Sequence, residues 1–231
     1  MRSRSGRWLD WILPVVVLVG LTIPFWMTDL DVSIARRFYE TGAGWARGGQ
    51  FPWNALFHYG VIPAWVLAVS ALAVLVASFW AARCRPHRRA AIFLVLAMMV
   101  GPGLVVNNVF KQHWGRPRPR DLVVFGGDRD YVKPWVKSPR ENGNAFVSGH
   151  AATGFYLLVP YFLLRRRSKA RAASLVALGV GYGAIIGVAR MAQGAHFLSD
   201  ILWALGFVYL SALALFYALR LDQSEPLTRE S

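Results

Sequence analysis

Long apolar segments separated by short polar links are the main pattern in this chain. Few charged side chains occur in six stretches, namely residues 11–27, 59–82, 90–110, 145–164, 172–188 and 197–219. Each stretch has the roughly 17–25 residues that a membrane-spanning helix needs. The fifth is rich in Gly and Ala, which favours close packing against another helix. The pattern predicts an all-α membrane protein that forms one domain over residues 1–231 and has six transmembrane helices.

The first apolar stretch follows a basic start and could be read as a cleavable signal peptide. It is longer than the usual core of a signal peptide and ends without a small-x-small cleavage site. Both features favour a membrane helix that is retained. In the next link, residues 29–50, apolar residues are mixed with Arg36 and Arg37, which fits either a short helix on the bilayer surface or a plain loop.

The distribution of charge sets the expected orientation in the membrane. The chain has a net charge of +14, with 55% hydrophobic residues and a mean hydropathy of +0.37. Its Lys and Arg residues gather in the links, which indicates topology signals and lipid contacts and not a nucleic-acid surface. The most basic links, 83–89 and 165–171, fall on the same side as the N-terminus if there are six spans. The positive-inside rule then places both termini in the cytoplasm and the opposite helix ends outside.

The third stretch ends irregularly and leads into the longest polar link. It contains Gly101-Pro102-Gly103, followed by Asn107, and such groups at membrane depth need a polar neighbour. The link 111–145 is basic although it lies on the expected outer side. Its motif spacing is too ordered for a linker, so we expect this link to form a lid or wall over a site. A phosphate site explains its positive charge, because such a site needs cations even on the outside.

A polar turn runs into an apolar helix at residues 144–154, NAFVSGHAATG. The first N–H groups of a helix have no partners within it, and the helix dipole adds partial positive charge there. Ser148, Gly149 and Ala151 could therefore hold a phosphate group, with His150 beside it.

Three basic residues at span ends are candidates to bind the same phosphate, namely Lys111, Arg118 and Arg190. Arginine offers two parallel donors to phosphate oxygens, whereas lysine offers a point charge. A single basic residue at a span end more commonly contacts lipid headgroups. Arg116-Pro117 is a second Arg-Pro pair directly before Arg118-Pro119, so the phosphate ligand could be either arginine. If it is Arg118, Arg116 could still contact the same substrate.

His196 and Asp200 stand four residues apart near the start of the sixth stretch. On a helix this spacing puts them on one face, where the carboxylate can accept one imidazole N–H and leave the other nitrogen free as a nucleophile. The alternative is that Ser199 or Asp200 caps the helix while His196 lies in the preceding loop.

The three motifs Lys-x6-Arg-Pro, Ser-Gly-His and Arg-x5-His-x3-Asp occur in this order between apolar segments. Together they resemble the signature of the type 2 phosphatidic acid phosphatase (PAP2) superfamily, over the middle and C-terminal half of the chain. The segments GPGLVVN and FVSGHAA are similar to the bacterial branch that includes lipid A phosphatases. The resemblance implies a PAP2-like helical bundle in a bacterial inner membrane, with its active site at the outer membrane–water interface.

The same resemblance implies a mechanism for phosphate transfer. His196 would attack phosphorus to form a phosphohistidine, Asp200 would orient it, and His150 would protonate the leaving oxygen and then activate water. The phosphate oxygens would be held by Lys111, Arg118, Ser148, Gly149 and Arg190. No metal or cofactor is implied, because the cations already supply the electrostatic role of a metal. His58 and His113 are interpreted as ordinary interfacial histidines.

Two positions depart from the family pattern, which commonly has Pro where this chain has Val147 and Ser where it has Ala189. Neither change removes a principal catalytic group, so activity is expected. The candidate substrates are phospholipid or glycolipid phosphates in the bilayer, namely lipid A, undecaprenyl pyrophosphate or phosphatidylglycerophosphate. The alternatives are a lipid phosphotransferase of the same fold and a non-catalytic lipid transporter or binding scaffold. The single cysteine, Cys84, has no partner for an intrachain disulfide.

Overall fold

The structure is a computed structural model that describes residues 4–138 and 143–223. Its described residues form helices and contain two isolated β-bridges but no strand. Five helices in this part of the chain are long and apolar enough to cross a membrane: Arg7–Met27, Trp53–Ala77, Ala82–His113, Lys169–Ala192 and Leu198–Ala218. A sixth apolar helix, Gly149–Leu164, is shorter. The predicted all-α membrane bundle is therefore confirmed, with the fourth span shorter than expected.

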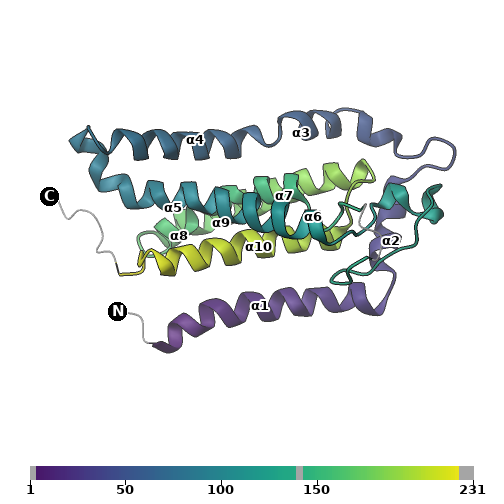
Figure 1. The fold of residues 1–231 in the computed structure, drawn as a ribbon, viewed down its shortest axis with the longest axis horizontal. Helices are drawn as coiled ribbons and strands as arrows, with labels where there is room; N and C mark the ends of the chain where they lie inside the picture. The colour runs from purple at the N-terminus through teal and green to yellow at the C-terminus, as the bar shows by residue number, and fades with distance from the viewer. Residues whose placement is uncertain (1–3, 139–142, 224–231) are drawn as a thin grey trace.

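The long helices lie side by side along one direction (Figure 1). They are α1 (Arg4–Met27), α3 (Trp53–Tyr59) with α4 (Ile62–Ala77), α5 (Arg88–Met98), α9 (Lys169–Ala192) and α10 (Leu198–Ala218). The short span consists of α7 (Gly149–Phe155), η7 (Tyr156–Leu158) and α8 (Tyr161–Leu164). It starts late because residues 145–148 form a non-helical approach to α7.

The core of the bundle lies around α7, which packs against α9 and α10. Phe155 and Tyr156 are almost completely buried there. Close packing depends on the glycines of α9: a Cβ atom at Gly179 would lie 2.3 Å from the backbone nitrogen of Leu158, and one at Gly183 would lie 2.1 Å from the ring of Phe155. The Gly and Ala content of this span therefore serves helix contact, as predicted.

The third span changes its winding halfway along. After α5 the chain continues as a π-helix, η4 (Met99–Phe110), and then as α6 (Lys111–His113). Pro102 lies inside η4 and supplies no N–H group, and the side-chain amide of Asn107 donates to the Pro102 carbonyl at 2.7 Å. The predicted irregularity is thus a wider helical turn whose polar groups find partners within the helix.

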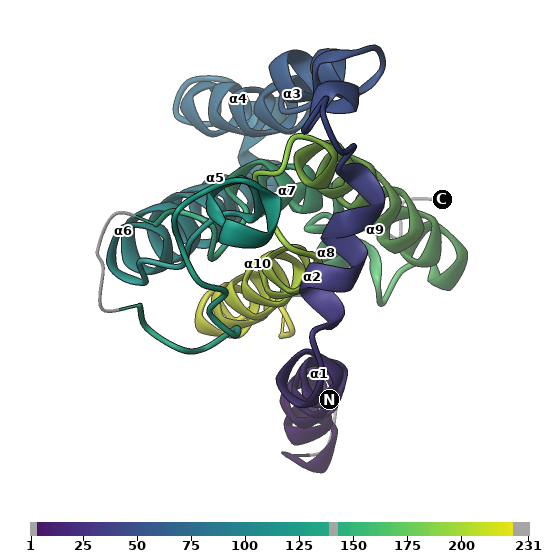
Figure 2. The ribbon, with the colours of Figure 1, turned by 90° about the vertical axis from the view of Figure 1, so that its right-hand side faces the viewer.

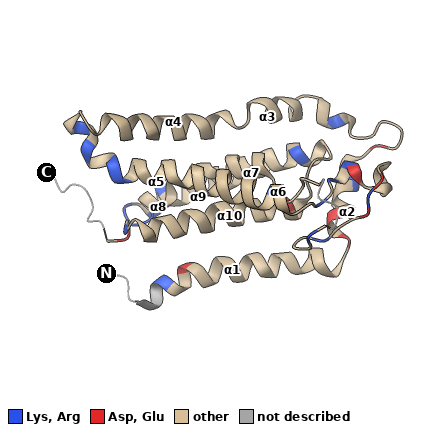
Figure 3. Cartoon of the chain, viewed as in Figure 1, with Lys and Arg blue, Asp and Glu red and all other residues tan. Residues whose placement is uncertain are grey.

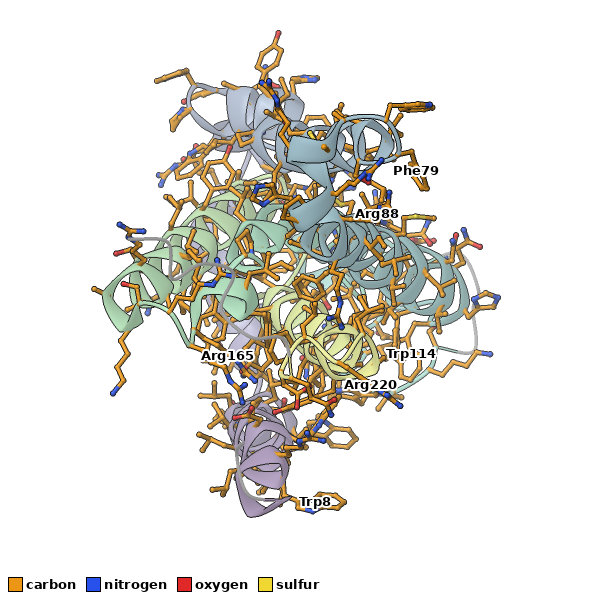
Figure 4. All side chains as sticks on the ribbon, turned by 90° about the vertical axis from the view of Figure 1, so that its left-hand side faces the viewer. Trp8, Phe79, Arg88, Trp114, Arg165 and Arg220 are labelled. Carbon is orange, nitrogen blue, oxygen red and sulfur yellow. The ribbon has the colours of Figure 1, made fainter. Side chains whose placement is uncertain are left out.

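Charged residues gather at the two ends of the bundle and leave the middle apolar (Figure 3). The start of α1, the end of α10 and the links 83–89 and 165–171 lie at one end (Figure 1). At this end Arg88 packs over Phe79 at 4.5 Å, and Arg165 pairs with Asp10 at 3.0 Å (Figure 4). The opposite end, where α6 ends and α10 begins, is called the site end below.

The link 29–50 contains a short helix, as one of its two sequence interpretations expected. It contains α2 (Leu30–Ala35), η1 (Arg36–Phe38) and η2 (Ala46–Gly49), and α2 crosses the site end of the bundle (Figure 2). Val32 and Ala35 pack against Leu122, Phe125 and Phe197. This segment is therefore not a plain loop, and the inner face of its helix α2 is buried against the rest of the protein.

The link 111–145 is folded against the site end over its described part. It contains η5 (Pro119–Asp121) and η6 (Val123–Phe125). Backbone hydrogen bonds join it to neighbouring segments, from Arg120 N–H to the Gly194 carbonyl and from Ala145 N–H to the Arg116 carbonyl, both at 3.0 Å. The link therefore lies as a wall beside the starts of α7 and α10, as its motif spacing suggested.

Candidate active site

The turn before α7 has the form that the sequence predicted for an anion site. Ser148 is completely buried and is the N-cap of α7, where its hydroxyl accepts the Ala151 N–H at 3.4 Å. The hydroxyl hydrogen therefore stays available to an acceptor. Gly149 and His150 form the first turn, whose N–H groups have no partners within the helix.

Gly149 lies directly against the side chain of Asn107 in the π-helix. A Cβ atom at this position would lie 2.5 Å from the side-chain oxygen of Asn107, well inside contact distance. The sequence indicated that Asn107 needs a polar neighbour, but it did not place this residue beside the Ser-Gly-His turn. The winding of η4 brings it there.

Three cations converge beside this turn. Lys111, Arg118 and Arg190 are partly or largely buried, and their charges lie close enough to repel one another. Burial, followed by repulsion from Arg120, lowers the pKa of Arg118 from its ordinary value. Such a cluster favours a bound anion, because an anion removes the repulsion.

Arg190 and Arg118 retain unused donors among the described residues. Arg190 is 8% exposed, and its Nη1 donates to Gln193, whereas its buried Nε has no hydrogen-bond partner in the described part of the chain. At Arg118 the backbone N–H donates to Asp121 at 3.0 Å, and the described residues offer its guanidinium no hydrogen-bond acceptor. Unpaired guanidinium donors at such a site fit a phosphate ligand.

Phe57 joins two of the predicted site residues. Its ring stacks on His150 at a centroid distance of 5.0 Å and lies 4.5 Å from the guanidinium carbon of Arg190. His58, interpreted from the sequence as an interfacial residue, lies against the same ring at 4.8 Å. No sequence pattern singles out Phe57, because aromatic residues are common in apolar spans.

His196 is almost completely buried and precedes α10, which begins at Leu198. Its Nδ1 lies 2.7 Å from the carbonyl oxygen of Ala145, so the proton belongs on Nδ1 and the lone pair on Nε2. Burial lowers the pKa of His196, and interaction with Asp200 opposes this without cancelling it. The imidazole is therefore neutral near pH 7, as a nucleophile requires.

The predicted pairing of His196 with Asp200 on one helical face is corrected by the structure. His196 lies before the helix, and its Nδ1 is 3.8 Å from the Asp200 carboxylate, beyond hydrogen-bond distance. Asp200 instead accepts the Phe197 N–H at 2.7 Å and Arg116 Nη1 at 2.5 Å. The alternative drawn from the sequence, with Asp200 at the helix start and His196 in the loop, describes the geometry.

Arg116 is the centre of a buried ionic cluster and not a substrate ligand. Its side chain has no exposure to solvent, and burial opposes its charge, but Asp200 and Asp31 outweigh burial and raise the pKa of Arg116. Its donors contact the Val132 carbonyl (2.8 Å), Ser199 Oγ (2.8 Å), Asp200 Oδ1 (2.5 Å), Asp31 Oδ2 (2.8 Å) and the Tyr131 hydroxyl (3.3 Å). The idea that Arg116 touches the same substrate as Arg118 is therefore wrong, because no donor remains for it.

The remaining sequence candidates lie as follows. His113 is exposed and contacts the carbonyl oxygens of Asn108 and Val109, consistent with an interfacial role. Val147 and Ala189, the two departures from the family pattern, are completely buried. No group of three or more His, Cys, Asp or Glu side chains among the described residues could hold a metal ion.

Comparison with known proteins shows the family to which this chain belongs. The profile of the PAP2 superfamily matches residues 90–223. A lipid A 4'-phosphatase of Francisella tularensis subsp. novicida is 35% identical over 219 residues, which is 90% of this chain and 97% of that protein. A lipid A 4'-phosphatase of Rhizobium leguminosarum is 38% identical over 124 residues, 53% of this chain and 50% of that protein. No solved structure gave a significant match.

The two arginines of the Arg-Pro-Arg segment should respond differently to the same substitution. Arg116→Gln leaves two buried carboxylates without their cation and should reduce the free energy of unfolding by about 3–5 kcal/mol. Arg118→Gln should change it by less than about 0.5 kcal/mol. It should weaken vanadate binding about tenfold or more, because a charge-assisted hydrogen bond is lost. Thermal unfolding in detergent and vanadate titration measure both effects, and equal destabilisation by the two variants would contradict the assignment.

Proposed function

The chain belongs to the PAP2 superfamily, and from this premise we propose that it is a membrane phosphatase that removes phosphate from a lipid phosphate without a metal. One observation carries the proposal. Three cations that form no salt bridge within the described residues converge on the turn at Ser148, beside a neutral histidine whose Nε2 has a free lone pair. This arrangement can bind a phosphate dianion and attack its phosphorus atom.

The first half of the proposed reaction transfers the phosphoryl group to the protein. The Nε2 lone pair of His196 forms a bond to phosphorus while the bond from phosphorus to the lipid oxygen breaks. The electron pair of that bond goes to the leaving oxygen, which takes a proton from His150. Lys111, Arg118 and Arg190 balance the charge on the equatorial oxygens, and Ser148 and the Gly149 N–H donate to them.

The second half releases phosphate. His150, now neutral, accepts a proton from a water molecule as the water oxygen bonds to phosphorus. The bond from phosphorus to Nε2 breaks, and its electrons return to His196. The Ala145 carbonyl keeps the proton of His196 on Nδ1 throughout, so the same tautomer serves both halves.

Lipid A is the substrate that we propose first. The relatives that match this chain bear the name lipid A 4'-phosphatase, and one of them aligns over 90% of this chain. Undecaprenyl pyrophosphate and phosphatidylglycerophosphate remain candidates of the same chemical class. A phosphotransferase would use the same phosphohistidine with a lipid hydroxyl in place of water. A transporter or binding scaffold is disfavoured, because it has no need of a neutral nucleophile beside the cations.

The proposed location is the inner membrane of a bacterium, where the chain is one domain with its site end at the periplasm. The basic links 83–89 and 165–171 support this orientation, because they lie with the start of α1 and the end of α10 at the other end of the bundle. Substrates would then come from the outer leaflet.

The orientation predicts the behaviour of two reporter fusions. Alkaline phosphatase fused after Arg220 should be inactive, since that enzyme folds only outside the cytoplasm, whereas alkaline phosphatase inserted near Gly126 should be active. A green fluorescent protein at the same positions serves as the inverse control. Reversed labelling would place the site in the cytoplasm and would exclude outer-leaflet substrates.

Phosphate release from a panel of lipids tests the proposed function directly. The protein purified in detergent should release phosphate from lipid A and should keep most of its rate in EDTA, because side-chain cations neutralise the substrate. The panel includes undecaprenyl pyrophosphate, phosphatidylglycerophosphate and phosphatidate, and a lipid alcohol acceptor is added to detect phosphotransfer. Loss of activity in EDTA that Mg²⁺ restores would refute the metal-independent mechanism.

Substitution of His196 and substitution of His150 should affect the reaction in different ways. His196→Ala removes the covalent route and should abolish turnover with every substrate. His150→Ala should slow the release of an alkyl leaving group by about 10²–10⁴-fold, because a general acid is lost. With p-nitrophenyl phosphate the leaving group needs little protonation, so His150→Ala should still give a burst of p-nitrophenol and a trapped phosphoenzyme in rapid-quench experiments. A burst in the His196 variant would exchange the two roles.

A further inference from the structure

The buried cluster around Arg116 contains one more negative charge than its cation requires. Asp31 and Asp200 each have no exposure to solvent, and both contact Arg116. Asp31 accepts hydrogen bonds from four donors, which is about the number that the two oxygens of a carboxylate can take. These donors are the Ser199 N–H (3.0 Å), Ser199 Oγ (2.5 Å), Arg116 Nη2 (2.8 Å) and the Tyr131 hydroxyl (3.2 Å).

Neutral acceptors could satisfy the remaining donors of Arg116, so a cluster that only held the chain together would not need a second carboxylate. One arginine and one aspartate would be neutral, and burying a further charge costs free energy. The extra negative charge therefore indicates that the cluster stabilises a positive charge on a neighbouring group. His196 lies directly before the helix that carries Ser199 and Asp200, and it becomes positively charged when its Nε2 bonds to phosphorus.

We propose that Asp31 is a positioning residue for His196, acting through the backbone N–H of Ser199, which Ser199→Ala would keep, and through Arg116. It holds the start of α10, which fixes His196 against the Ala145 carbonyl, and its charge stabilises the cation that forms on the imidazole. The proposal rests on the proposed function, in which His196 is the nucleophile. Asp31 comes from α2, more than 160 residues before His196, and no sequence motif connects them.

Other charged and titratable groups face His196 from each neighbouring element. Asp200 on α10 is 3.8 Å away, and its charge is shared with Arg116. The remaining groups are Arg190 on α9, His150 on α7 and, through the ionic cluster, Arg116, Asp31 and Tyr131. Arg190 opposes a positive charge on His196, so the surplus negative charge of the cluster offsets it.

The test compares Asp31→Asn with Ser199→Ala. Both variants remove hydrogen bonds from the same cluster, but only Asp31→Asn removes a charge. A charge interaction that shifts the equilibrium for the imidazole cation by one pKa unit corresponds to about a tenfold change. We expect Asp31→Asn to lower the rate constant of phosphohistidine formation about tenfold, with KM changed by less than about twofold. Ser199→Ala should keep the rate constant within about twofold and lower only the thermal stability.

Rapid-quench measurement of the burst separates this role from a structural one. With lipid A and with p-nitrophenyl phosphate, the burst amplitude reports the fraction of folded enzyme, and the burst rate constant reports the chemistry. Full amplitude with a reduced rate constant in Asp31→Asn supports the proposal. A reduced amplitude with an unchanged rate constant, or an equal reduction of the rate constant in Ser199→Ala, overturns it. If the wild-type protein forms no phosphohistidine, the proposed function fails first and this inference fails with it.

Discussion

The burial of Arg116 constrains the whole site end of this protein. A guanidinium group without solvent must find an acceptor for every donor, and here the acceptors come from α2, the link 111–145 and the start of α10. These three segments are far apart in the sequence, and their positions are set together by one side chain. His196 follows from this constraint, since it is attached to the helix start that Arg116 and Asp31 hold.

Two kinds of arginine therefore lie side by side in this protein. Arg116 is saturated by carboxylates and carbonyl groups, whereas Arg118 and Arg190 keep donors that the described residues do not use. The first kind fixes the geometry, and the second kind would bind the phosphate group under the proposed function. The separation matters because an arginine already paired with buried carboxylates gains little from a phosphate.

The sequence predicted the helical bundle, the Ser-Gly-His turn and the cluster of cations, because each depends on local pattern or on motif spacing. It did not predict the partner of His196, because a spacing of four residues fits both a side-chain pair on a helix and a cap at its start. Asp31, Phe57 and Asn107 were also missed as site residues. Each acts through contacts with distant segments, and such contacts leave no periodicity in a single sequence.

The helices α2 and α3 contribute residues to the site although they lie outside the part of the chain that matches the PAP2 profile. Asp31 and Phe57 both precede residue 90, where the match to the PAP2 profile begins. A fragment that contained only the matched residues would carry all three motifs, yet it would lack Asp31, one of the two carboxylates that contact Arg116, and the aromatic ring of Phe57 beside His150 and Arg190. The family profile thus covers the three sequence motifs, while α2 and α3 supply residues that surround those motifs in the structure.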